Sequence, residues 1–560
     1  MDRSAMLVTL LGKKPITAAH TLEIPLTPPE TEGTLAPYTG SWGYEQAAHL
    51  LRRATFGPTY TQIKDAVTQG LDATINLLFK DLPLPEPPAN PSFANDPSVP
   101  IGATWISAPY DAQVNVRTYR NQSLRSWAMG LLLQEGVSIR EKLTLFWHNH
   151  FAVNTMNIND PKFFYQYITT LRSNAWGNFR DLVKAITVDP AMLRFLNGNQ
   201  NTRRAPNENY ARELMELFTL GKGDTAGPGD YTTFTEHDVV QMARVLTGWR
   251  DVGHYSNNPA INVGAVFQPN QHDTGTKQLS HRFSNITIGN MGDQEYKHLV
   301  DIIFQKPEVA LFISRKLYRW FVYYEIDAAT EQQVIAPMAQ LLIDHNYDIQ
   351  PALTALLKSE HFFHILSIGP MIKNPLDFIV SAIKQTGTAL PTALAMQYAS
   401  WLSLFRSAQT MQMEYFNPPD VAGWKAYYQE PTYYRIWINA STLPPRMTYT
   451  NTLTGNGYGI GGGFRLKINV LDFIKTLDDP YDPNKVVTGF AKILFPQPLS
   501  EPQVLALKEV LIPGLPDYEW GIEYTDYEAN PNNTQLARAV EAKLRELLSA
   551  MLSMPEFYLS

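Results

Sequence analysis

The chain contains no cysteine among its 560 residues. Disulfide bonds, thiolate catalysis and metal sites with cysteine ligands are therefore excluded. Charged residues are also scarce, at 18% against roughly a quarter in an average protein. The net charge is −7, and no run of basic residues is longer than a pair such as Arg203-Arg204. Nucleic acid is therefore not expected as a partner, because its phosphates require a basic surface.

The sequence near the N-terminus has no long apolar run. The stretch from Met6 to Leu11 is far shorter than the about 20 apolar residues that a membrane span needs. It also lacks the apolar core and the small-residue cleavage site of a signal peptide. We therefore expect no transmembrane segment, and no recognisable signal peptide is present in this sequence.

Aromatic residues are plentiful, at 12%, with 28 tyrosines and 11 tryptophans. This composition is found in carbohydrate-binding and extracellular proteins, but also in ordinary cores and protein interfaces. Trp249 and Trp424 follow helix-like segments near glycine or proline. They are suited either to stacking on a sugar or to filling the core, and we retain them as candidate substrate-binding residues.

Apolar residues recur with helical spacing along most of the chain, as they do between Ile63 and Leu71. Alternating patterns typical of strands are almost absent, so sheet is expected only as short pieces in 251–292 or 451–470. The sequence thus predicts a mainly α fold: a large single multi-helical domain with long polar loops and few short strands. Beyond the first helix, we predict helices over about 115–155, 160–200, 207–221, 235–248, 294–325, 330–345, 350–365, 374–387, 391–413 and 537–554.

Composition divides the chain into three parts. Residues 1–44 are rich in threonine and proline and are expected to form an extended arm. Residues 45–450 are expected to form the helical core, with loop insertions at 81–110 and 251–292. Residues 451–560 begin with a Gly-rich segment and continue as C-terminal helices that pack on the core. Because no strand is expected before the glycines and no helix directly after them, a flexible linker is favoured over a phosphate-binding loop.

A polar stripe lies on the predicted helix that ends at Gly221, a residue suited to the left-handed turn after a helix. At about 100° per residue, Asn209, Arg212 and Glu213 share one face with Glu216. These side chains are suited to binding a metal ion or a sugar. The alternative is a solvated face on which Glu208 and Arg212 form an ion pair at i,i+4.

Two histidines, His148 and His150, lie in a segment with helical character. They are about 200° apart on such a helix, so they are not expected to bind one metal ion together. The alternative is that both are hydrogen-bonded in a packing layer between helices. Asp238 lies in the first turn of another helix, where Thr235 and Asp238 form a capping-box-like pair.

His272, Asp273 and Lys277 lie close together in the polar segment 251–292. A histidine and a carboxylate are the minimum for general acid–base catalysis, and a lysine can hold an anionic group. Loops of this kind often carry ligand-binding residues. The three residues are therefore candidates for a site.

Several segments together resemble the large bacterial family catalogued as "domain of unknown function 1800", and the match runs in order from about residue 45 to the C-terminus. The resemblance implies export or a place on the cell surface, but it implies no defined activity. The segments that carry it are 50–58, 146–151, 207–221, 238–249, 272–277, 373–375, 417–424 and 555–557.

Two functions from different classes are consistent with these patterns. The first is a hydrolase or transferase acting on carbohydrate or another polymer, with a divalent metal ion as a candidate cofactor. The second is a non-catalytic structural or surface assembly protein, with a polysaccharide or protein partner or a homo-oligomeric state, whose polar cluster is a packing network. Both predict that His148 or His150 meets Arg212, Glu213 and Asp238. Candidate catalytic residues are His148, His150, Glu213, Asp238, His272 and Asp273; candidate substrate-binding residues are Asn209, Arg212, Lys277, Trp249 and Trp424.

Overall fold

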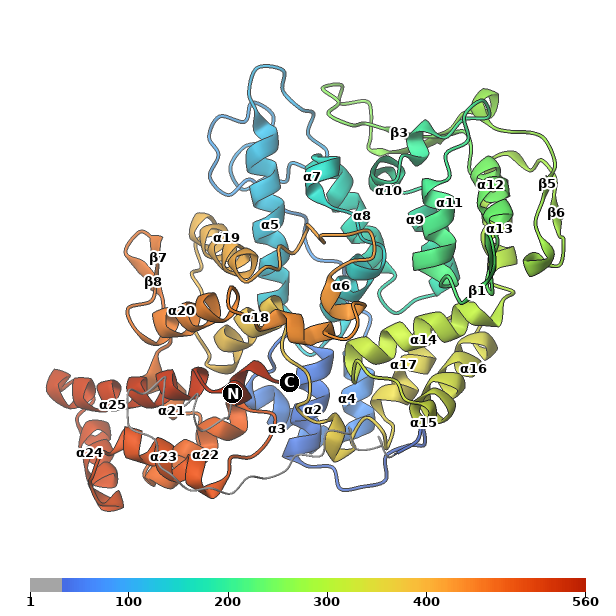
Figure 1. Ribbon diagram of the computed structural model, residues 1–560. Helices are drawn as coiled ribbons and strands as arrows, with labels where there is room; N and C mark the ends of the chain where they lie inside the picture. The colour runs from blue at the N-terminus through green and yellow to red at the C-terminus, as the bar shows by residue number, and fades with distance from the viewer. Residues whose placement is uncertain (1–32) are drawn as a thin grey trace.

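The computed structural model describes residues 33–560, and helices make up most of its regular structure (Figure 1). A capping box formed by Thr59 and Gln62 begins the second described helix, which buries Ile63 and Ala66 as their spacing predicts. The N-terminal group consists of α2 (Tyr44–Ala54), α3 (Tyr60–Gln69) and α4 (Leu71–Leu78).

A central group of helices follows the irregular segment 79–115, which contains the predicted loop at 81–110. Asp160 and Asp189 each accept hydrogen bonds from first-turn N–H groups and are each followed by proline, a typical start of a helix. Every residue of α6 is buried, so this helix runs through the core with its polar side chains inside. The group comprises α5 (Val116–Gln134), α6 (Arg140–His150), α7 (Thr155–Ile158), α8 (Pro161–Ser173), α9 (Phe179–Thr187) and α10 (Pro190–Phe195).

The helix predicted over 207–221 changes type halfway. It begins as α11 (Asn209–Glu213) and continues as the π-helix η2 (Leu214–Thr219). The Thr219 hydroxyl donates to the carbonyl of Leu214 over 2.5 Å, and this bond accompanies the wider turn. Gly221 ends the helix with φ +73°, as expected. The capping box of Thr235 and Asp238 begins α12 (Glu236–Val245), also as expected.

The remaining helices form the second half of the chain. Proline occupies the first turn of several of them, including α14, α18 and α22, where its missing N–H costs nothing. They are α13 (Glu295–Ile303), α14 (Pro307–Phe321), α15 (Ala328–Thr330), η6 (Glu331–Ile335), α16 (Ala336–Asp344), α17 (Ile349–Leu357), α18 (Pro375–Gln385), α19 (Leu394–Thr410), α20 (Leu443–Thr454), α21 (Val470–Ile474), α22 (Pro483–Leu494), α23 (Glu501–Leu511), α24 (Asp517–Ala529) and α25 (Thr534–Leu552).

Strands form only short antiparallel pairs in the described residues, so the predicted mainly α fold is confirmed. Their positions were predicted incompletely, because the first pair lies outside the two expected regions and the second begins at Trp249. The pairs are β1 (Thr225–Gly227) with β2 (Asp230–Tyr231), β3 (Trp249–Val252) with β4 (Gly264–Phe267), β5 (Lys277–Gln278) with β6 (Thr287–Ile288), and β7 (Tyr458–Gly461) with β8 (Phe464–Leu466).

The Gly-rich segment is not the expected flexible linker. It contains the end of α20 and the hairpin of β7 and β8, which projects from the body of the protein beside α20 (Figure 1). Gly457 has φ +70°, and a Cβ atom there would lie 2.6 Å from the Cβ of Lys467. Glycine therefore permits a close approach between the loop and β8, a use of glycine that a linker would not need.

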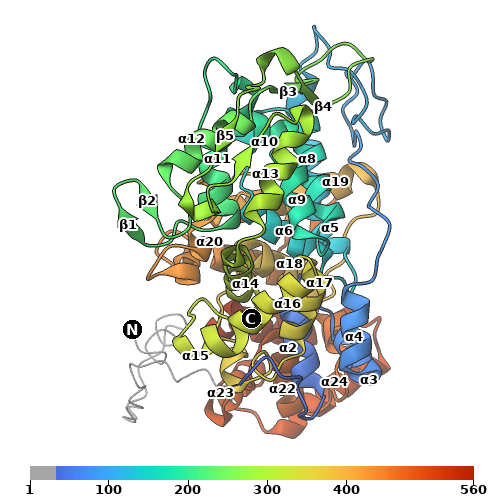
Figure 2. The ribbon, with the colours of Figure 1, turned by 90° about the vertical axis from the view of Figure 1, so that its right-hand side faces the viewer.

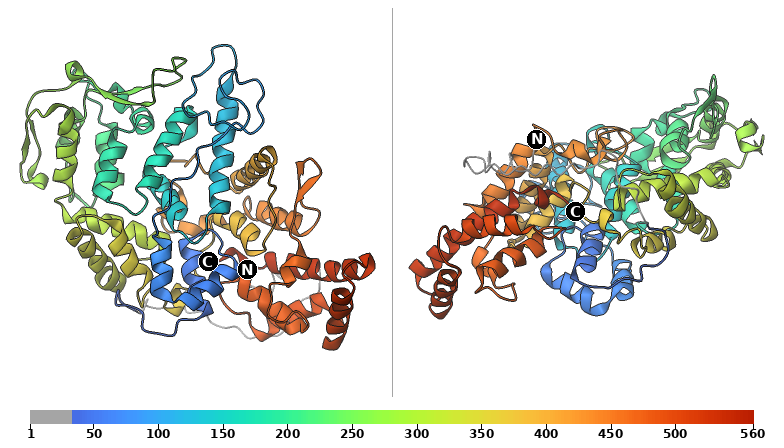
Figure 3. Two further views of the ribbon diagram at one scale, coloured as in Figure 1. Left: turned by 180° about the vertical axis from the view of Figure 1, so that it is seen from behind. Right: turned by 60° about the horizontal axis from the view of Figure 1, so that its bottom comes forward.

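Helices from the two ends of the described chain lie side by side (Figures 1 and 3). The Tyr44 hydroxyl and the Arg52 guanidinium both donate to the carbonyl of Lys492, which joins α2 to α22. Figure 2 shows α2, α3, α22 and α24 at one end of the molecule and α12 and the pair of β3 and β4 at the other. Among the described residues, no helix combines the length and the apolar character required to cross a bilayer.

Most of the predicted arm lies outside the described residues. Only residues 33–43 can be compared, and they run without a helix along the segment that follows α17. The backbone N–H of Leu35 donates to Gln333 and that of Tyr38 to Lys358. This part of the arm therefore lies against the core, and the expected loose attachment of residues 1–40 stays a prediction.

Gly423 supports a fold prediction, because it has φ +91° and a Cβ atom there would lie 2.4 Å from the carbonyl oxygen of Asn149. We expect Gly423→Ala to lower the free energy of unfolding by roughly 2–4 kcal/mol, through steric overlap and backbone strain. Urea denaturation followed by circular dichroism measures this change. Gly70→Ala is the matched control, because Gly70 has φ +87° and open space around its Cβ position. Equal losses in the two variants would show that the contact with Asn149 contributes nothing.

Candidate functional site

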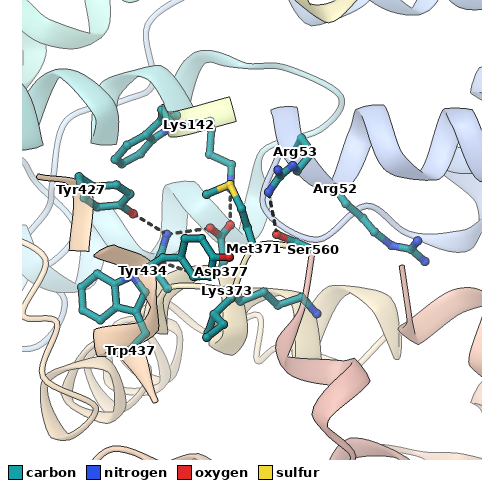
Figure 4. A pocket seen from close by; sticks show the side chains of 13 residues that line it. Arg52, Arg53, Lys142, Met371, Lys373, Asp377, Tyr427, Tyr434, Trp437 and Ser560 are labelled. Carbon is teal, nitrogen blue, oxygen red and sulfur yellow. Dashed lines mark hydrogen bonds and ion pairs between the residues drawn. The ribbon is translucent and has the colours of Figure 1, made fainter. Parts of the chain in front are cut away.

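A small cavity of about 30 Å³ lies where α2, α6 and the start of α18 meet the last residues of the chain (Figure 4). Four cationic side chains and one acidic side chain line it, together with aromatic rings from α14 and from the 3₁₀ turns η8 (Lys425–Tyr427) and η9 (Tyr433–Trp437). The charged and polar lining residues are Arg52, Arg53, Lys142, Lys373, Asn374, Asp377 and Ser560; the aromatic ones are Trp320, Tyr427, Tyr434 and Trp437.

One part of the cavity is electrically neutral. Lys142 on α6 forms an ion pair with Asp377 in the first turn of α18. The side-chain amide of Asn374 donates to the other Asp377 oxygen over 2.7 Å, and also to the Tyr427 hydroxyl over 3.2 Å. Asn374 in turn caps α18, because its side-chain oxygen accepts from the N–H of Asp377. This network fixes the carboxylate and satisfies its charge.

The other part of the cavity carries positively charged side chains and no acidic side chain. Arg53 donates to the carbonyl of Val322 and, over 3.4 Å, to the Ser560 hydroxyl, while its Nε atom is buried without a partner. Arg52 is directed away from Arg53 towards the carbonyls of Lys492 and Ile493, and its Nε also lacks a partner. In the described residues, neither guanidinium forms an ion pair.

Lys373 adds a further buried cation. Its amine donates to the carbonyl of Phe557 over 2.8 Å and lies 4.3 Å from the centre of that ring. Arg446 lies behind it and donates to the Lys373 carbonyl over 2.9 Å, while its Nε and Nη1 atoms are buried without partners. No carboxylate pairs with either side chain in the described part of the chain.

Burial lowers the pKa values of these cationic groups. Burial lowers the pKa of Lys373 to about 7, and Arg52 adds to this effect. Burial likewise lowers the pKa of Arg53 to about 10 and that of Arg446 to about 10. Lys142 is also shifted downwards in pKa by burial, although Asp377 opposes the shift. The lining side chains therefore include more cationic groups than the one acidic side chain, Asp377, can pair with.

Several residues predicted for a site are held in packing contacts instead. The Nε2 of His148 donates to the carbonyl of Tyr415 over 2.9 Å, and that of His150 to the carbonyl of Phe218 over 3.0 Å. Burial lowers the pKa of His148 to about 3 and that of His150 well below its usual value. Both histidines are therefore neutral at ordinary pH. As expected from their spacing, they contact different parts of the protein.

Asp238 and Arg212 have local partners of their own. The Asp238 carboxylate is fully buried and accepts hydrogen bonds from Thr235 and Ser280. Arg212 pairs with Glu236 over 2.7 Å and with Glu208 over 3.4 Å, the second being the predicted i,i+4 pair. In the described residues, no hydrogen bond or ion pair joins either histidine to Arg212, Glu213 or Asp238. The predicted meeting of these side chains is therefore wrong, because nearer groups satisfy the two histidines, Arg212 and Asp238.

Glu213 differs from the other residues of the predicted cluster. It lies half-buried at the end of α11 and forms no hydrogen bond with another described residue. Burial raises its pKa to about 7, and the neighbouring carboxylates of Glu216 and Asp420 add to the shift, while Arg212 opposes it. A carboxyl group that titrates near neutral pH can donate or accept a proton, so Glu213 keeps the chemistry expected of a catalytic candidate.

The loop candidates do converge, through a residue that the sequence analysis missed. Glu295 is fully buried, accepts from His272 over 3.0 Å and pairs with Lys277. Asp273 contributes its carbonyl to Lys277, and its carboxylate pairs with Arg244 over 2.7 Å. The group closes the 251–292 segment onto α13 and leaves Lys277 no exposed surface.

The other candidate binding residues form no side-chain hydrogen bond or ion pair with these groups in the described residues, although the Trp424 ring packs edge-on against His148. Trp424 is buried, and its backbone N–H donates to the Asn149 side chain over 2.8 Å. Trp249 on β3 packs edge-on against Tyr296, and Asn209 is exposed at the start of α11. Trp424 therefore fills the core. Within the described residues, no group of three or more His, Asp or Glu side chains is placed to hold a metal ion.

The cavity residues escaped the sequence analysis because they come from distant parts of the chain. Arg52 and Arg53 lie in the segment 50–58 and Lys373 in the segment 373–375, both of which carried the family resemblance. That resemblance was the only available signal. Nothing in the local spacing indicates that α2 and the start of α18 share a cavity.

The chain belongs to the family described as "Protein of unknown function (DUF1800)", whose model matches residues 49–559. The resemblance inferred from the motif segments is thereby confirmed. No curated protein and no solved structure matches the chain. Membership of this family assigns no activity to the chain. The proposal for its function therefore rests on the geometry of the site.

The pair of Lys142 and Asp377 gives a testable prediction. Asp377→Asn leaves the Lys142 charge buried without a partner, so we expect the free energy of unfolding to fall by about 3 kcal/mol. Adding Lys142→Met removes the stranded charge and is expected to recover most of that loss. Chemical denaturation of both variants measures the two changes. A double variant as unstable as Asp377→Asn alone would mean that the network with Asn374, and not the ion pair, carries the stability.

Proposed function

We propose that the cavity binds a small anion, or the anionic group of a larger molecule, and that this binding is the function of the site. The observation that supports this proposal is the excess of buried cationic side chains, because Arg52, Arg53, Lys142 and Lys373 line the cavity with Asp377 as the single acidic side chain. Burying a cation without a counter-charge is costly, and an anion in the cavity offsets that cost.

The chemistry of the free donors favours an oxyanion. Arg53 has an unpartnered Nε, and a guanidinium suits the geometry of carboxylate, sulfate and phosphate groups. The cavity volume of about 30 Å³ fits one such group and excludes an extended chain from its interior. The rings of Tyr434 and Trp437 provide an apolar wall for the part of a ligand next to its charge (Figure 4).

Lys373 links anion binding to protonation. With a pKa of about 7 in the free protein, its amine is partly neutral at neutral pH. A bound anion favours the charged amine and therefore raises this pKa. Binding then takes up protons, and the affinity falls as the pH rises above 7, where the free site has already lost its proton.

A non-catalytic packing role accounts for His148, His150 and Asp238. His148 and His150 donate to main-chain carbonyls, and Asp238 is saturated by Thr235 and Ser280. These contacts support the structural alternative for these residues: separately satisfied polar groups that fix how α6 packs on η2 and the 415–424 segment, and how α12 packs on the segment around Ser280.

A second candidate function is hydrolysis or transfer on carbohydrate or another polymer, with Glu213 as the general acid. Its half-buried carboxyl has a pKa raised to about 7 by burial and by Glu216 and Asp420. A carboxyl group with a raised pKa is the usual general acid in the cleavage of glycosidic bonds. This function is independent of the anion site.

The anion site is tested by thermal unfolding in phosphate or sulfate. At a hundredfold excess over Kd, we expect the anion to add about 2.7 kcal/mol to the stability of the full-length protein. Lys373→Met and Arg53→Met should abolish the increment without lowering the stability measured in chloride, because each removes an uncompensated buried charge. Chloride at equal ionic strength and Lys485→Met, on the exposed surface of α22, are the controls.

Calorimetry in buffers of different ionisation enthalpy extends the same experiment to pH. The wild type should take up protons on binding phosphate and bind more weakly above pH 7, whereas Lys373→Met should show neither effect. An increment from sulfate that is equal in the wild type and in both cavity variants would contradict the proposal. The cations would then be balanced within the chain.

The second candidate is tested with Glu213→Gln on a panel of polysaccharides, with release of reducing ends as the measurement. We expect release to fall by roughly 100-fold or more, since general acid catalysis contributes that much. In the wild type, release should decline as the pH rises above 7, because the acid form of Glu213 is lost. Glu208→Gln, which changes a paired carboxylate on the same segment, is the control. Release that is absent from the wild type or unaffected in Glu213→Gln would reject this function.

A further inference from the structure

A second concave site lies far from the cavity, between the hairpin of β7 and β8 and the helix α25. It has a volume of about 700 Å³, within the range of pockets that hold small ligands. Four of its lining side chains are cationic, and one is a carboxylate. The lining residues are formed by the end of α20, the hairpin and one face of α25.

These cations lie on two elements that line the same groove, the helix α25 and the end of β8. Arg538, Glu541, Ala542 and Arg545 recur at i, i+3, i+4 and i+7 and so share one face of α25. Arg465 and Lys467 are two residues apart at the end of β8 and point to one side of the hairpin, while Leu466 between them is buried.

Two of the arginines serve to build the site. Arg545 pairs with Glu541 over 2.6 Å and donates to the carbonyl of Thr454 at the end of α20. Arg465 donates to the carbonyls of Asn456 and Gly457, which fixes the loop before β7. These bonds fix the positions of α25 and of the loop before β7. They use most of the N–H donors of the two guanidinium groups.

Lys467 and Arg538 remain free. Both are exposed, and in the described residues neither forms a hydrogen bond or an ion pair through its side chain. Within the site, only Glu541 carries negative charge, and Arg545 neutralises it. The free charges thus line an open groove, on a protein whose net charge is −7.

We propose that this groove binds an acidic carbohydrate, a sugar that carries sulfate, carboxylate or phosphate groups. Lys467 and Arg538 provide the charge for its anionic groups. Asn456 and Glu541 provide acceptors for hydroxyl groups, which an inorganic anion would leave unused. The groove has no aromatic side chain among its lining residues, so it offers no surface for stacking nucleic-acid bases.

The experiment measures binding of a fluorescent heparin oligosaccharide to the full-length protein at low salt. We expect binding that weakens with added salt, and a loss of at least tenfold in affinity for the Lys467→Glu/Arg538→Glu double variant. Lys485→Glu, an exposed charge change on α22 outside the groove, should bind within twofold of the wild type. Circular dichroism checks that each variant is folded.

Three comparison ligands decide whether the recognition is of an acidic sugar. A neutral dextran oligosaccharide of equal length should not bind, free sulfate at matched sulfate concentration should compete only weakly, and single-stranded DNA should bind more weakly than heparin. Equal affinity of the wild type and the double variant would overturn the proposal. Full competition by sulfate alone, or DNA binding as tight as heparin binding, would overturn it too. None of these outcomes depends on the anion cavity, which both groove substitutions leave unchanged.

Discussion

Burial of positive charge around one carboxylate is the constraint on which the centre of this protein depends. Asp377 neutralises Lys142, and Asn374 holds that carboxylate at the start of α18. Because a charge deprived of its partner in the interior is costly, this pair fixes how α6 and α18 meet. The neighbouring cations Arg53 and Lys373 are then placed in the same cavity without a carboxylate of their own.

The cavity also joins the two ends of the described chain. Arg52 binds carbonyls of α22, Arg53 reaches Val322 and Ser560, and the amine of Lys373 donates to Phe557. Three cations of the cavity lining thus donate to carbonyl groups of other segments of the chain. An anion in the cavity would act on all of these contacts together, so the proposed function couples ligand binding to the stability of the whole fold.

The family motifs fall into two physical classes. The segment 146–151 and the segment 417–424 hold each other: Asn149 binds the backbone of Trp424, and Gly423 leaves no space for a side chain against Asn149. The segments 50–58 and 373–375 instead bring cations to the cavity. A segment that matches the family can therefore serve helix packing as well as ligand binding. In this protein, buried positive charge without an acidic partner distinguishes the proposed binding segments from the packing segments.

Much of the local structure followed from the sequence, because helical periodicity, the Thr235 capping box and the turn at Gly221 depend on neighbours within a few residues. The sequence also excluded cysteine chemistry and identified the family. It placed His148 or His150 in one cluster with Arg212, Glu213 and Asp238, however, and among the described residues no hydrogen bond or ion pair joins either histidine to the other three. Which groups a side chain contacts depends on distance in space and not on distance along the chain. Asp238 accepts a hydrogen bond from Ser280, and His272 and Lys277 both contact Glu295. The cationic cavity was likewise decided by tertiary structure alone, since Arg53 and Lys373 are far apart in sequence and the cost of their charges arises only on burial.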